Sequence, residues 1–463
     1  MNVGAQITKR NRERPNSTRK ASPARRTAFE VLRRVEEEGA YAAPLLAGAT
    51  EHLRTDDRAL CYELVLGVLR WQLWLDRLTE HYAGRGADTI DAPVRRALRL
   101  GLYQLRLLTR VPASAAINES VNLVHEARLR SAAGFVNAVL RRATREPAYD
   151  PTNGIADSIE RIAVRTSHPP WLIGRWVAAF GAEEAEAFAA SNNHIPSVAF
   201  RLNPSRQASG AAMMVIDQLK ATGAKISESH IAPGAWRVEG VNGALLRSLA
   251  ENGAIYLQDE ASQLVAHALG VCRGERVLDV CAAPGSKTTH LAALAEDQAF
   301  VVAGDIHEHR LRVVGEAASR QSLQSIRRVA FDAAAGVPFA DGTFDRVLID
   351  APCTGTGTLR HNPEIRWRIT PTDFAELAAR QQGILAGAAG AVRIGGLLVY
   401  STCSVEREEN ESVIEEFLRT HISFKQVLVE TSKTLLVEGG AARTWPHKHD
   451  VDGFFIAALV RGG

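Results

Sequence analysis

Apolar residues recur at a helical spacing over the first third of the chain. Phe29, Leu32 and Val35 follow one another at three-residue steps, which places them on one face of a helix. Three later runs follow the same rule: "DDRALCYELVLGVLRWQLWLDRLTEHY", "AAINESVNLVHEARL" and "AAGFVNAVLRRATRE". Because no strand pattern interrupts them, residues 22–146 predict an all-α bundle of roughly 120 residues.

A different pattern begins after "REPAYDPTNG", residues 145–154, where Pro, Gly, Asn and Asp cluster as they do in linkers. The following run, "HPPWLIGRWVAAFGAEEAEAFAASNN", has helical spacing, and "SVAFRLNP" is typical of a strand. We therefore expect a small α+β connector that ends near residue 245.

From Arg276 onwards, short β-rich runs alternate with helical runs. The strand-like runs are "RVLDVC", "AFVVAGD", "DRVLID" and "LLVYSTC", and a late run, "GFFIAALV", supplies one more strand. Strands that alternate with helices at this spacing are typical of parallel sheets. The pattern predicts an α/β domain with a doubly wound, mostly parallel sheet.

Length and composition indicate a globular protein of two or three domains, with 463 residues, 46% of them hydrophobic and 23% charged. No stretch approaches the ~18 consecutive apolar residues of a membrane span, and the basic segment 1–20 does not resemble a secretory signal. The cysteines at positions 61, 272, 281, 353 and 403 form no CxxC pair, so neither a structural zinc site nor a disulfide framework is predicted. We expect a reduced, cytoplasmic compartment.

The charge is unevenly distributed although its sum is only +3. Residues 1–150 hold 25 Lys and Arg against 17 Asp and Glu, whereas the remainder holds 30 against 35. The first 26 residues carry eight basic side chains and one acid, which fits either a solvated tail or an arm that contacts nucleic acid. This asymmetry favours an anionic partner for the N-terminal part.

The first strand of the α/β region leads into "CAAPGSK", residues 281–287, which opens a helix. Backbone N–H groups at a helix N-terminus point toward a ligand, and small side chains let a ligand approach closely. The turn contains neither GxGxxG nor GxxxxGK[ST], so a pyrophosphate fingerprint is absent. An ordinary strand-to-helix turn and a ligand-binding loop both fit this segment taken alone.

Acidic residues close successive strands of this region. Asp305 ends the second strand, 26 residues after Asp279, where an acid can accept hydrogen bonds from ribose hydroxyls. Asp332 closes the third strand, where it could accept from an adenine amino group, and Asp350 ends the fourth. A single such acid is usually a solvated loop carboxylate, but the series predicts a nucleoside-binding edge.

Two cysteines lie at strand ends beside these acids. Cys353 follows Asp350 in "DAPC", and Cys403 ends the fifth strand in "YSTCS". The fourth and fifth strands of an open parallel sheet are commonly neighbours, so both thiols should face one crevice. A single strand-end cysteine is usually structural, whereas two beside an acid favour nucleophilic chemistry. The acidic run after Cys403 is interpreted as the first turn of the next helix.

The segments "DVCAAPGSKT", "DAPCTGTGTLRHNPEIRW" and "YSTCS" resemble the motifs of RNA 5-methylcytosine methyltransferases that use S-adenosylmethionine. The helical N-terminal part resembles the NusB-like RNA-binding domain. This combination is similar to the bacterial RsmB (Fmu/Sun) family, which methylates a cytosine of small-subunit rRNA. The resemblance covers nearly the whole chain beyond the basic arm and is weakest between about 150 and 245.

The resemblance implies a role for each matching residue. Cys403 matches the nucleophile that attacks carbon 6 of the cytosine, and Cys353 matches a second cysteine needed for product release, which could also be the base at carbon 5. Asp305 matches the ribose-binding acid, Asp332 the acid on the adenine side, and Asp350 lies next to both cofactor and base. The loop over the methionine part of the cofactor matches Cys281, Ala282, Ala283, Pro284, Gly285, Ser286 and Lys287, of which Lys287 could also touch the cytosine.

Two departures from the family pattern are visible. Ser286 stands where many bacterial members have Gly, and His361-Asn362 precedes Pro363 where a basic pair is more usual. Neither change removes a catalytic group, but the second leaves the fine RNA contacts open. The thiol of Cys281 is interpreted as structural, and Cys61 and Cys272 as core or loop residues.

The resemblance also implies a domain plan and partners. We expect a basic disordered arm at 1–21, a NusB-like RNA-binding domain at 22–148, a linker with a small α+β RNA-binding subdomain at 149–245, and a Rossmann-like methyltransferase domain at 246–463. The expected cofactor is S-adenosylmethionine without a metal, and the expected partner of the monomer is small-subunit rRNA, with no membrane.

Three alternatives to this reading stay open. A tRNA cytosine-5 methyltransferase would share the chemistry, although the helical N-terminal part argues against it. An RNA-binding assembly or transcription factor without catalysis is disfavoured because both cysteines and all the strand-end acids are present. A thiol-redox protein is the least favoured, since the cysteines have no close spacing in the sequence.

Overall fold

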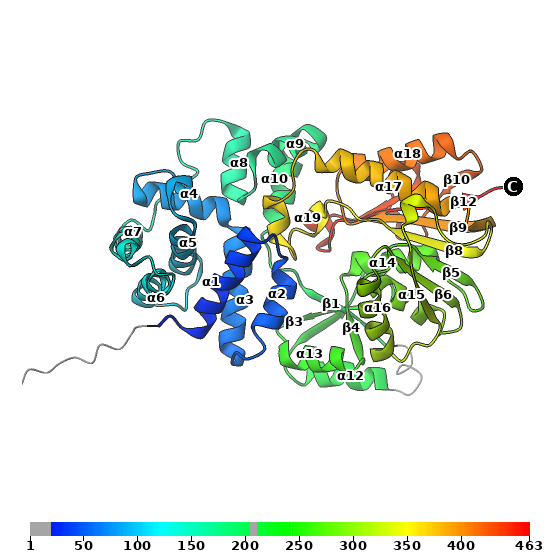
Figure 1. The fold of residues 1–463 in the computed structure, drawn as a ribbon, viewed down its shortest axis with the longest axis horizontal. Helices are drawn as coiled ribbons and strands as arrows, with labels where there is room; N and C mark the ends of the chain where they lie inside the picture. The colour runs from blue at the N-terminus through cyan, green and yellow to red at the C-terminus, as the bar shows by residue number, and fades with distance from the viewer. Residues whose placement is uncertain (1–19, 204–210, 242) are drawn as a thin grey trace, which may run out of the picture. The chain divides into compact units, whose positions relative to one another are not determined.

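The computed structural model describes residues 20–203, 211–241 and 243–463, and the chain divides into two compact units, Met1–Asn153 and Gly154–Gly463 (Figure 1). The described part of the first unit is helical, as the apolar spacing predicts. Leu32 and Val35 are buried in its core and Phe29 packs against it. Its α-helices are α1 (Pro23–Glu37), α2 (Ala42–Ala49), α3 (Thr55–Arg70), α4 (Gln72–Ala83), α5 (Ala92–Leu107), α6 (Ala113–Glu126) and α7 (Ala133–Arg145).

The predicted basic arm lies, up to residue 19, outside the described residues. At its end Ala21 is buried, and its backbone N–H donates to Glu126 Oε1 over 2.6 Å. The N–H of Ser22 donates in the same way to Glu119 Oε2. These two bonds fix the start of α1 against α6.

The second unit begins with helices and a small antiparallel sheet. The helices are α8 (Ser158–Thr166), α9 (Pro170–Phe180) and α10 (Ala182–Ser191). The sheet has the order β2-β3-β1-β4, and along the chain its elements read β-α-β-β-α-β, which is the ferredoxin-like arrangement. These elements are β1 (Val198–Leu202), α12 (Ala211–Lys220), β2 (Lys225–Glu228), β3 (Ala235–Glu239), α13 (Gly243–Glu251) and β4 (Ile255–Leu257).

The large sheet of the second unit has the order β10-β12-β9-β8-β5-β6-β7, with β11 paired to β12. The strands β5 to β9 pair in parallel, whereas β12 runs antiparallel to β9 and to β10. The doubly wound, mostly parallel sheet expected from the sequence is therefore confirmed. Its strands are β5 (Arg276–Asp279), β6 (Phe300–Asp305), β7 (Ile326–Ala330), β8 (Phe344–Asp350), β9 (Val392–Thr402), β10 (Phe424–Val427), β11 (Ala442–Arg443) and β12 (Phe455–Arg461).

Helices cover both faces of this sheet (Figure 1). On one face α14 (Glu260–Leu269), α15 (Ser286–Leu294) and α16 (Glu308–Arg320) pack against the strands, and on the other α17 (Asp373–Ala389) and α18 (Glu411–Thr420) do so. The consecutive residues Val277 and Leu278 of β5 enter the hydrophobic cores on opposite faces of the sheet, because successive side chains of a strand point to opposite faces. None of the described helices is long and apolar enough to cross a membrane.

Candidate active site

A cavity of about 220 Å³ opens at the carboxyl ends of the parallel strands. Strand order reverses on either side of β5, and open α/β sheets bind ligands at such a switch point. Seven of the residues singled out in the sequence line this cavity: Cys281, Ala283, Asp305, Asp332, Asp350, Cys353 and Cys403. The described residues that line it also include four that sequence reasoning did not single out: Ile306, Arg310, Phe331 and Arg380.

The loop 281–287 is held tightly between β6 and α16. The N–H of Ala282 donates to Gly304 O over 2.7 Å, and the Ala283–Pro284 peptide bond is cis. Gly285 has a φ of +105°, and a side chain on it would place a Cβ 3.0 Å from the Cα of Val314. Only glycine satisfies both conditions without strain. The other loop residues, Ala282, Pro284, Gly285, Ser286 and Lys287, are not among the cavity lining.

The acids at the ends of β6 and β7 are positioned by their own turns. Asp305 Oδ1 accepts the N–H of His307 over 2.9 Å, and Oδ2 pairs with Arg310 Nη1 at 3.2 Å. Asp332 Oδ1 accepts the N–H of Ala334 over 3.0 Å. Each carboxylate thus has a fixed orientation at the cavity edge, where hydroxyl or amino groups of a nucleoside could donate to it.

Asp350 links the loop 281–287 to β9. Its Oδ2 accepts from Lys287 Nζ over 2.7 Å, and its Oδ1 accepts from Ser401 Oγ over 2.8 Å. Burial lowers the pKa of Lys287, but the charge and hydrogen bond of Asp350 outweigh it, so the pKa is raised overall. Lys287 is therefore a buried ammonium, and its Nζ lies 5.1 Å from the centre of the Phe454 ring.

The two strand-end thiols are in contact. Cys353 Sγ and Cys403 Sγ lie 3.3 Å apart, because β8 and β9 pair in parallel with Asp350 opposite Ser401. The hydrogen bond from Cys403, followed by burial and the nearby carboxylates, raises the pKa of the Cys353 thiol well above its usual value. Cys353 is consequently held in the protonated form at neutral pH.

Glu409 joins the loops that carry these thiols. Its Oε1 accepts the N–H of Thr354 over 2.8 Å and the Gln381 amide over 3.0 Å. Its Oε2 accepts from the hydroxyls of Thr354 and Ser404, the neighbours of Cys353 and Cys403. Burial raises the pKa of Glu409 despite these bonds. The acidic run lies at helix starts, as the sequence predicts: Glu408 and Glu409 are in the short 3-10 helix Arg407–Glu409, and Glu411 is in the first turn of α18. The sequence did not predict that Glu409 is buried.

Three sequence models match this chain in succession. The "NusB family" matches residues 22–145, the "RsmF/B-like, ferredoxin-like domain" matches 168–242, and "16S rRNA methyltransferase RsmB/F" matches 266–460. A Bacillus subtilis protein named "Probable ribosomal RNA small subunit methyltransferase B" is 36% identical over 96% of this chain and 100% of its own length. The chain belongs to the RsmB family. Members of this family are S-adenosylmethionine-dependent RNA methyltransferases.

Further relatives and solved structures agree with this family. The Pseudomonas putida protein named "Ribosomal RNA small subunit methyltransferase B" is 35% identical over 88% of this chain and 91% of its own. The crystal structure of PH0851 has a TM-score of 0.80 and 26% identity, covering 96% of this chain and all of that one. A methyltransferase homolog protein from Pyrococcus horikoshii has a TM-score of 0.57 and 27% identity, covering 67% of this chain and all of its own.

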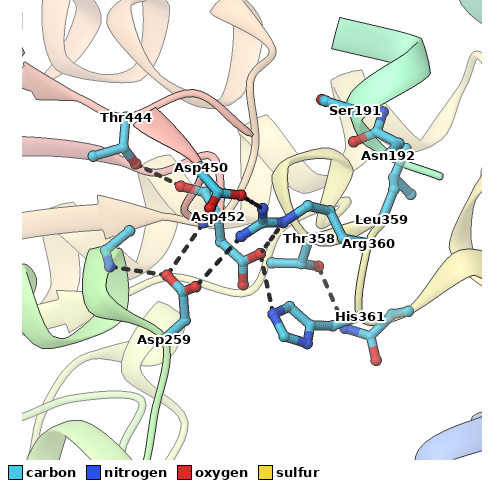
Figure 2. A network of polar contacts seen from close by, with 12 residues as sticks. Ser191, Asn192, Asp259, Thr358, Leu359, Arg360, His361, Thr444, Asp450 and Asp452 are labelled. Atoms are coloured by element: carbon cyan, nitrogen blue, oxygen red, sulfur yellow. Dashed lines mark hydrogen bonds and ion pairs between the residues drawn. The ribbon is translucent and has the colours of Figure 1, made fainter. Parts of the chain in front are cut away.

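The segment at which this sequence departs from the RsmB pattern belongs to a partly buried polar network (Figure 2). Arg360 is 2% exposed; its Nη1 donates to Asp450 Oδ1 over 3.0 Å, and its Nε lies 3.5 Å from Asp452 Oδ1. His361 Nε2 reaches the same oxygen at 3.5 Å. Burial raises the pKa values of Asp259 and Asp452 to about 7. The network fixes the end of the Cys353 loop against the segment before β12.

The same network contains the one group of metal-type ligands found among the described residues. Atoms of Asp259, His361 and Asp452 lie within 4.8 Å of one another. The guanidinium of Arg360 already stands among these carboxylates, with its Nη2 3.7 Å from Asp259 Oδ2. Because Arg360 supplies the positive charge that such a cluster needs, the geometry favours an ion-paired structural network over a metal centre.

Proposed function

We propose that this RsmB-family chain transfers a methyl group from S-adenosylmethionine to carbon 5 of a cytosine in small-subunit rRNA, through a covalent adduct with Cys403. The observation that carries the proposal is the contact between two strand-end thiols beside Asp350, at the mouth of an acid-lined cavity. Covalent catalysis splits one difficult step into two easier ones, and this arrangement supplies the groups that both steps need.

The acids and the apolar walls of this cavity support S-adenosylmethionine as its ligand, which would supply an electrophilic methyl group. Asp305 would accept from the ribose hydroxyls and Asp332 from the adenine amino group. Ile306 and Phe331 offer apolar surface on the same walls. The loop residues Cys281, Ala282, Ala283, Pro284, Gly285, Ser286 and Lys287 would pass over the methionine part, where Gly285 keeps the backbone clear of side chains.

Cys403 would form a bond between its sulfur and carbon 6 of the cytosine. The pair of electrons from the carbon 5–carbon 6 double bond then becomes available at carbon 5, which attacks the methyl group. Asp350 lies within the same cavity and would face N3 of the base, where a proton shared with the carboxyl stabilises the charge that develops. The buried Lys287 ammonium fixes the orientation of that carboxyl.

Release of the product requires a base, such as a water molecule, to take the proton at carbon 5. The electrons of that carbon–hydrogen bond then re-form the carbon 5–carbon 6 double bond as the carbon 6–sulfur bond breaks and the sulfur leaves as a thiolate. Cys353 would assist this second half, because its thiol lies 3.3 Å from the sulfur that must leave. A thiol held protonated at that distance can donate to the departing thiolate. Chemistry on a base also requires the base to be unstacked, so the RNA must present the cytosine in a single-stranded or extruded form.

The remaining parts of the chain would position the RNA. We assign RNA binding to the NusB-like domain, residues 22–148, and to the subdomain 149–245, with methyl transfer in 246–463. The excess of basic over acidic residues in 1–150 supports this division. We also propose that the protein acts on rRNA as a monomer in the cytoplasm.

A covalent trap tests the proposal. The protein is mixed with S-adenosylmethionine and small-subunit rRNA that contains 5-fluorocytosine, whose fluorine cannot leave as a proton does. We expect a denaturation-resistant protein–RNA adduct with wild type and with Cys353→Ala, and none with Cys403→Ala. An adduct of Cys353→Ala on ordinary RNA would support the release role. Absence of any adduct, with RNA binding intact, would refute the covalent mechanism for this substrate.

The substrate is tested separately. Methyl transfer to unmodified small-subunit rRNA is compared with transfer to tRNA under identical conditions, and binding of S-adenosylmethionine is measured by calorimetry. We expect cofactor binding and transfer to rRNA alone. Transfer to tRNA would change the substrate but keep the chemistry, whereas failure to bind the cofactor would favour an RNA-binding factor without catalysis.

A further inference from the structure

A second cavity, of about 650 Å³, lies in the same unit and shares no lining residue with the first. Its walls come from β1, the segment before β3, and the helices α14 and α15, together with the turn after α16. Its polar lining includes Arg201, His267, His290, Gln321 and Ser322. Half of its polar lining is buried, namely Arg201, Asn203, His290 and Gln321.

Arg201 places a buried positive charge at this cavity. The residue is 3% exposed; its Nε donates to Gln258 Oε1 over 3.2 Å, and its Nη2 donates to Thr289 Oγ1 over 2.9 Å. The guanidinium carbon lies 4.6 Å from the centre of the Tyr256 ring. Its Nη1 has no hydrogen-bond partner among the described residues, and no described carboxylate lies within ion-pair distance of Arg201.

A buried guanidinium without an anion is costly, and two other buried arginines of this unit, Arg360 and Arg443, each pair with a carboxylate. Burial lowers the pKa of Arg201 to about 10, which Tyr256 offsets only in part. The charge is retained at neutral pH even so, because that pKa lies well above 7. Arg201 therefore lacks a counter-charge that some other molecule could provide.

Three further buried polar side chains around the cavity have an atom without a partner. They are His290 Nδ1, His267 Nε2 and Gln321 Oε1. The two imidazoles stand edge to face at 5.1 Å, and burial lowers the pKa of both, so they are neutral. Native proteins leave few buried polar groups unpaired, and those left are commonly satisfied by water or a ligand.

The acids at the rim do not neutralise Arg201. Glu296 pairs with Arg273, and the carboxylate of Asp297 accepts the backbone N–H groups of Gln324 and Ser325 over 2.8 and 2.9 Å. Both carboxylates are thus engaged elsewhere. The lining therefore contains one guanidinium and two carboxylates, and neither carboxylate lies within ion-pair distance of Arg201.

We propose that this cavity binds a phosphate group, carried by a small phosphate ester or by a nucleotide of the substrate RNA. A guanidinium with a free N–H matches phosphate oxygens, and an imidazole beside it can donate a further hydrogen bond. Pro233, Leu294 and Leu323 line the same cavity and offer apolar surface to a sugar. Pockets of this volume accept ligands of nucleotide size. The site is independent of the proposed methyl transfer.

Calorimetric titration of the full-length protein with inorganic phosphate and with ribose 5-phosphate tests the proposal. Ribose 5-phosphate carries no base, so it separates this cavity from the proposed cytosine and adenine sites. We expect wild type to bind at least one probe, and Arg201→Met to bind neither. Because Arg201→Met also loses two internal hydrogen bonds, its folding is checked by circular dichroism, and a second variant at the rim is needed.

Ser322 provides that variant with a matched control. It is exposed at the cavity and has a φ of +60°, a conformation that Asn and Asp tolerate. We expect Ser322→Asp to weaken phosphate binding about three- to tenfold through charge repulsion, and Ser322→Asn to leave it unchanged. Absence of binding by wild type, or equal binding by all variants, would overturn the proposal and leave water as the occupant.

The source of the phosphate is distinguished with RNA. If the cavity takes a phosphate of the substrate, Arg201→Met and Ser322→Asp weaken rRNA binding relative to Ser322→Asn, and ribose 5-phosphate competes with the RNA. If it takes a free ester, RNA affinity is the same in all variants while the ester titration still differs. Neither readout depends on methyl transfer, so a failure here is distinct from a failure of the proposed function.

Discussion

Cys353 and Cys403 lie 50 residues apart in the chain, yet their sulfur atoms are 3.3 Å from each other. The parallel pairing of β8 with β9 produces this contact, since the two cysteines follow directly after the paired strand ends. At this distance the two thiols can be oxidised to a disulfide bond with each other, a reaction that needs both of them.

Mild oxidation should join these two thiols and stop methyl transfer. A disulfide bond is about 2.0 Å long, so the sulfurs need to approach by roughly 1.3 Å. Treatment with diamide, which is reduced as the two thiols are oxidised, should inactivate the enzyme, and dithiothreitol should restore it. Peptide mapping should find a Cys353–Cys403 bridge. Inactivation without a Cys353–Cys403 bridge in the peptide map would contradict this explanation, while Cys272, which is exposed, serves as an internal reference for general oxidation.

Substitution of Glu409 should disturb the proposed chemistry more than cofactor binding. The Glu409 carboxylate joins the neighbours of both cysteines and contributes to the raised pKa of Cys353. For Glu409→Gln we expect kcat to fall about tenfold or more, with the Kd of S-adenosylmethionine unchanged. Removal of the negative charge should also lower the pKa of Cys353, so its alkylation by iodoacetamide should begin at a lower pH.

The control for this experiment is Glu408→Gln, since Glu408 pairs with Arg175 on α9 and, among the described residues, has none of the hydrogen bonds to Thr354 and Ser404 that Glu409 makes. Equal losses of kcat in the two variants would show that turnover does not depend on the hydrogen bonds between Glu409 and the neighbours of the two cysteines. An unchanged alkylation profile of Cys353 in Glu409→Gln would likewise argue against an electrostatic role.

A methyl group at Gly357 should separate the two cysteine loops. A Cβ there would lie 2.0 Å from Gly453 O and 2.8 Å from Cys403 O, and these are backbone atoms that cannot rotate away. The N–H of Gly357 also donates to Cys403 O over 2.9 Å. We expect Gly357→Ala to lose most of its activity and to unfold about 1–3 kcal/mol more easily. Gly174→Ala, which gains only ordinary contacts with Ile159, should change neither quantity by a comparable amount.

The stability of the second unit should depend on pH through Asp279. Burial raises the pKa of this carboxyl to about 7, compared with ~3.9 in an unfolded chain. Between these values the unfolded chain has released the proton and the folded chain still holds it. The free energy of unfolding therefore falls as the pH rises through this window. Asp279→Asn cannot ionise, so its stability relative to wild type should improve by about 2–3 kcal/mol between pH 5 and pH 8.

Denaturant unfolding at pH 5 and pH 8 measures this difference. Asp345→Asn is the matched control, because hydrogen bonds and charge from Arg276 and Arg393 overcome burial and lower the pKa of Asp345. A lowered pKa stabilises the fold at all pH values above ~3.9 and loses this effect only below it. The effect of Asp345→Asn should consequently be the same at both pH values. If Asp279→Asn changed the free energy of unfolding by the same amount at pH 5 and pH 8, the raised pKa of Asp279 would be contradicted.

The alternation of elements and the strand-end positions of the acids and thiols were predictable from the sequence. They depend on local spacing, and an open parallel sheet brings its carboxyl strand ends to one edge whatever the details. The ferredoxin-like sheet was predictable only as a strand-containing connector. In this sheet β1 pairs with both β3 and β4, and the sequence pattern did not predict β3 or β4 as strands.

The buried polar residues were not predictable in this way. Glu409 and Arg360 have the side chains of exposed residues, and both are buried because distant segments provide their partners. Arg201 sits in a strand-like run of five residues, where nothing local shows that a guanidinium will face Thr289, 88 residues later. The sequence predicted that the two thiols share one crevice, but only the structure shows that they are in contact, 3.3 Å apart.

The position of β12 has a consequence for how the protein is made. In the sheet this strand lies between β9 and β10, although it follows both along the chain, and it pairs with six residues of β9 up to Thr402. During synthesis, β9 therefore emerges with one edge exposed and gains its neighbour only after residues 455–461 have left the ribosome. Until then Cys403 stands at the end of an edge strand, and the nascent chain carries an incomplete site.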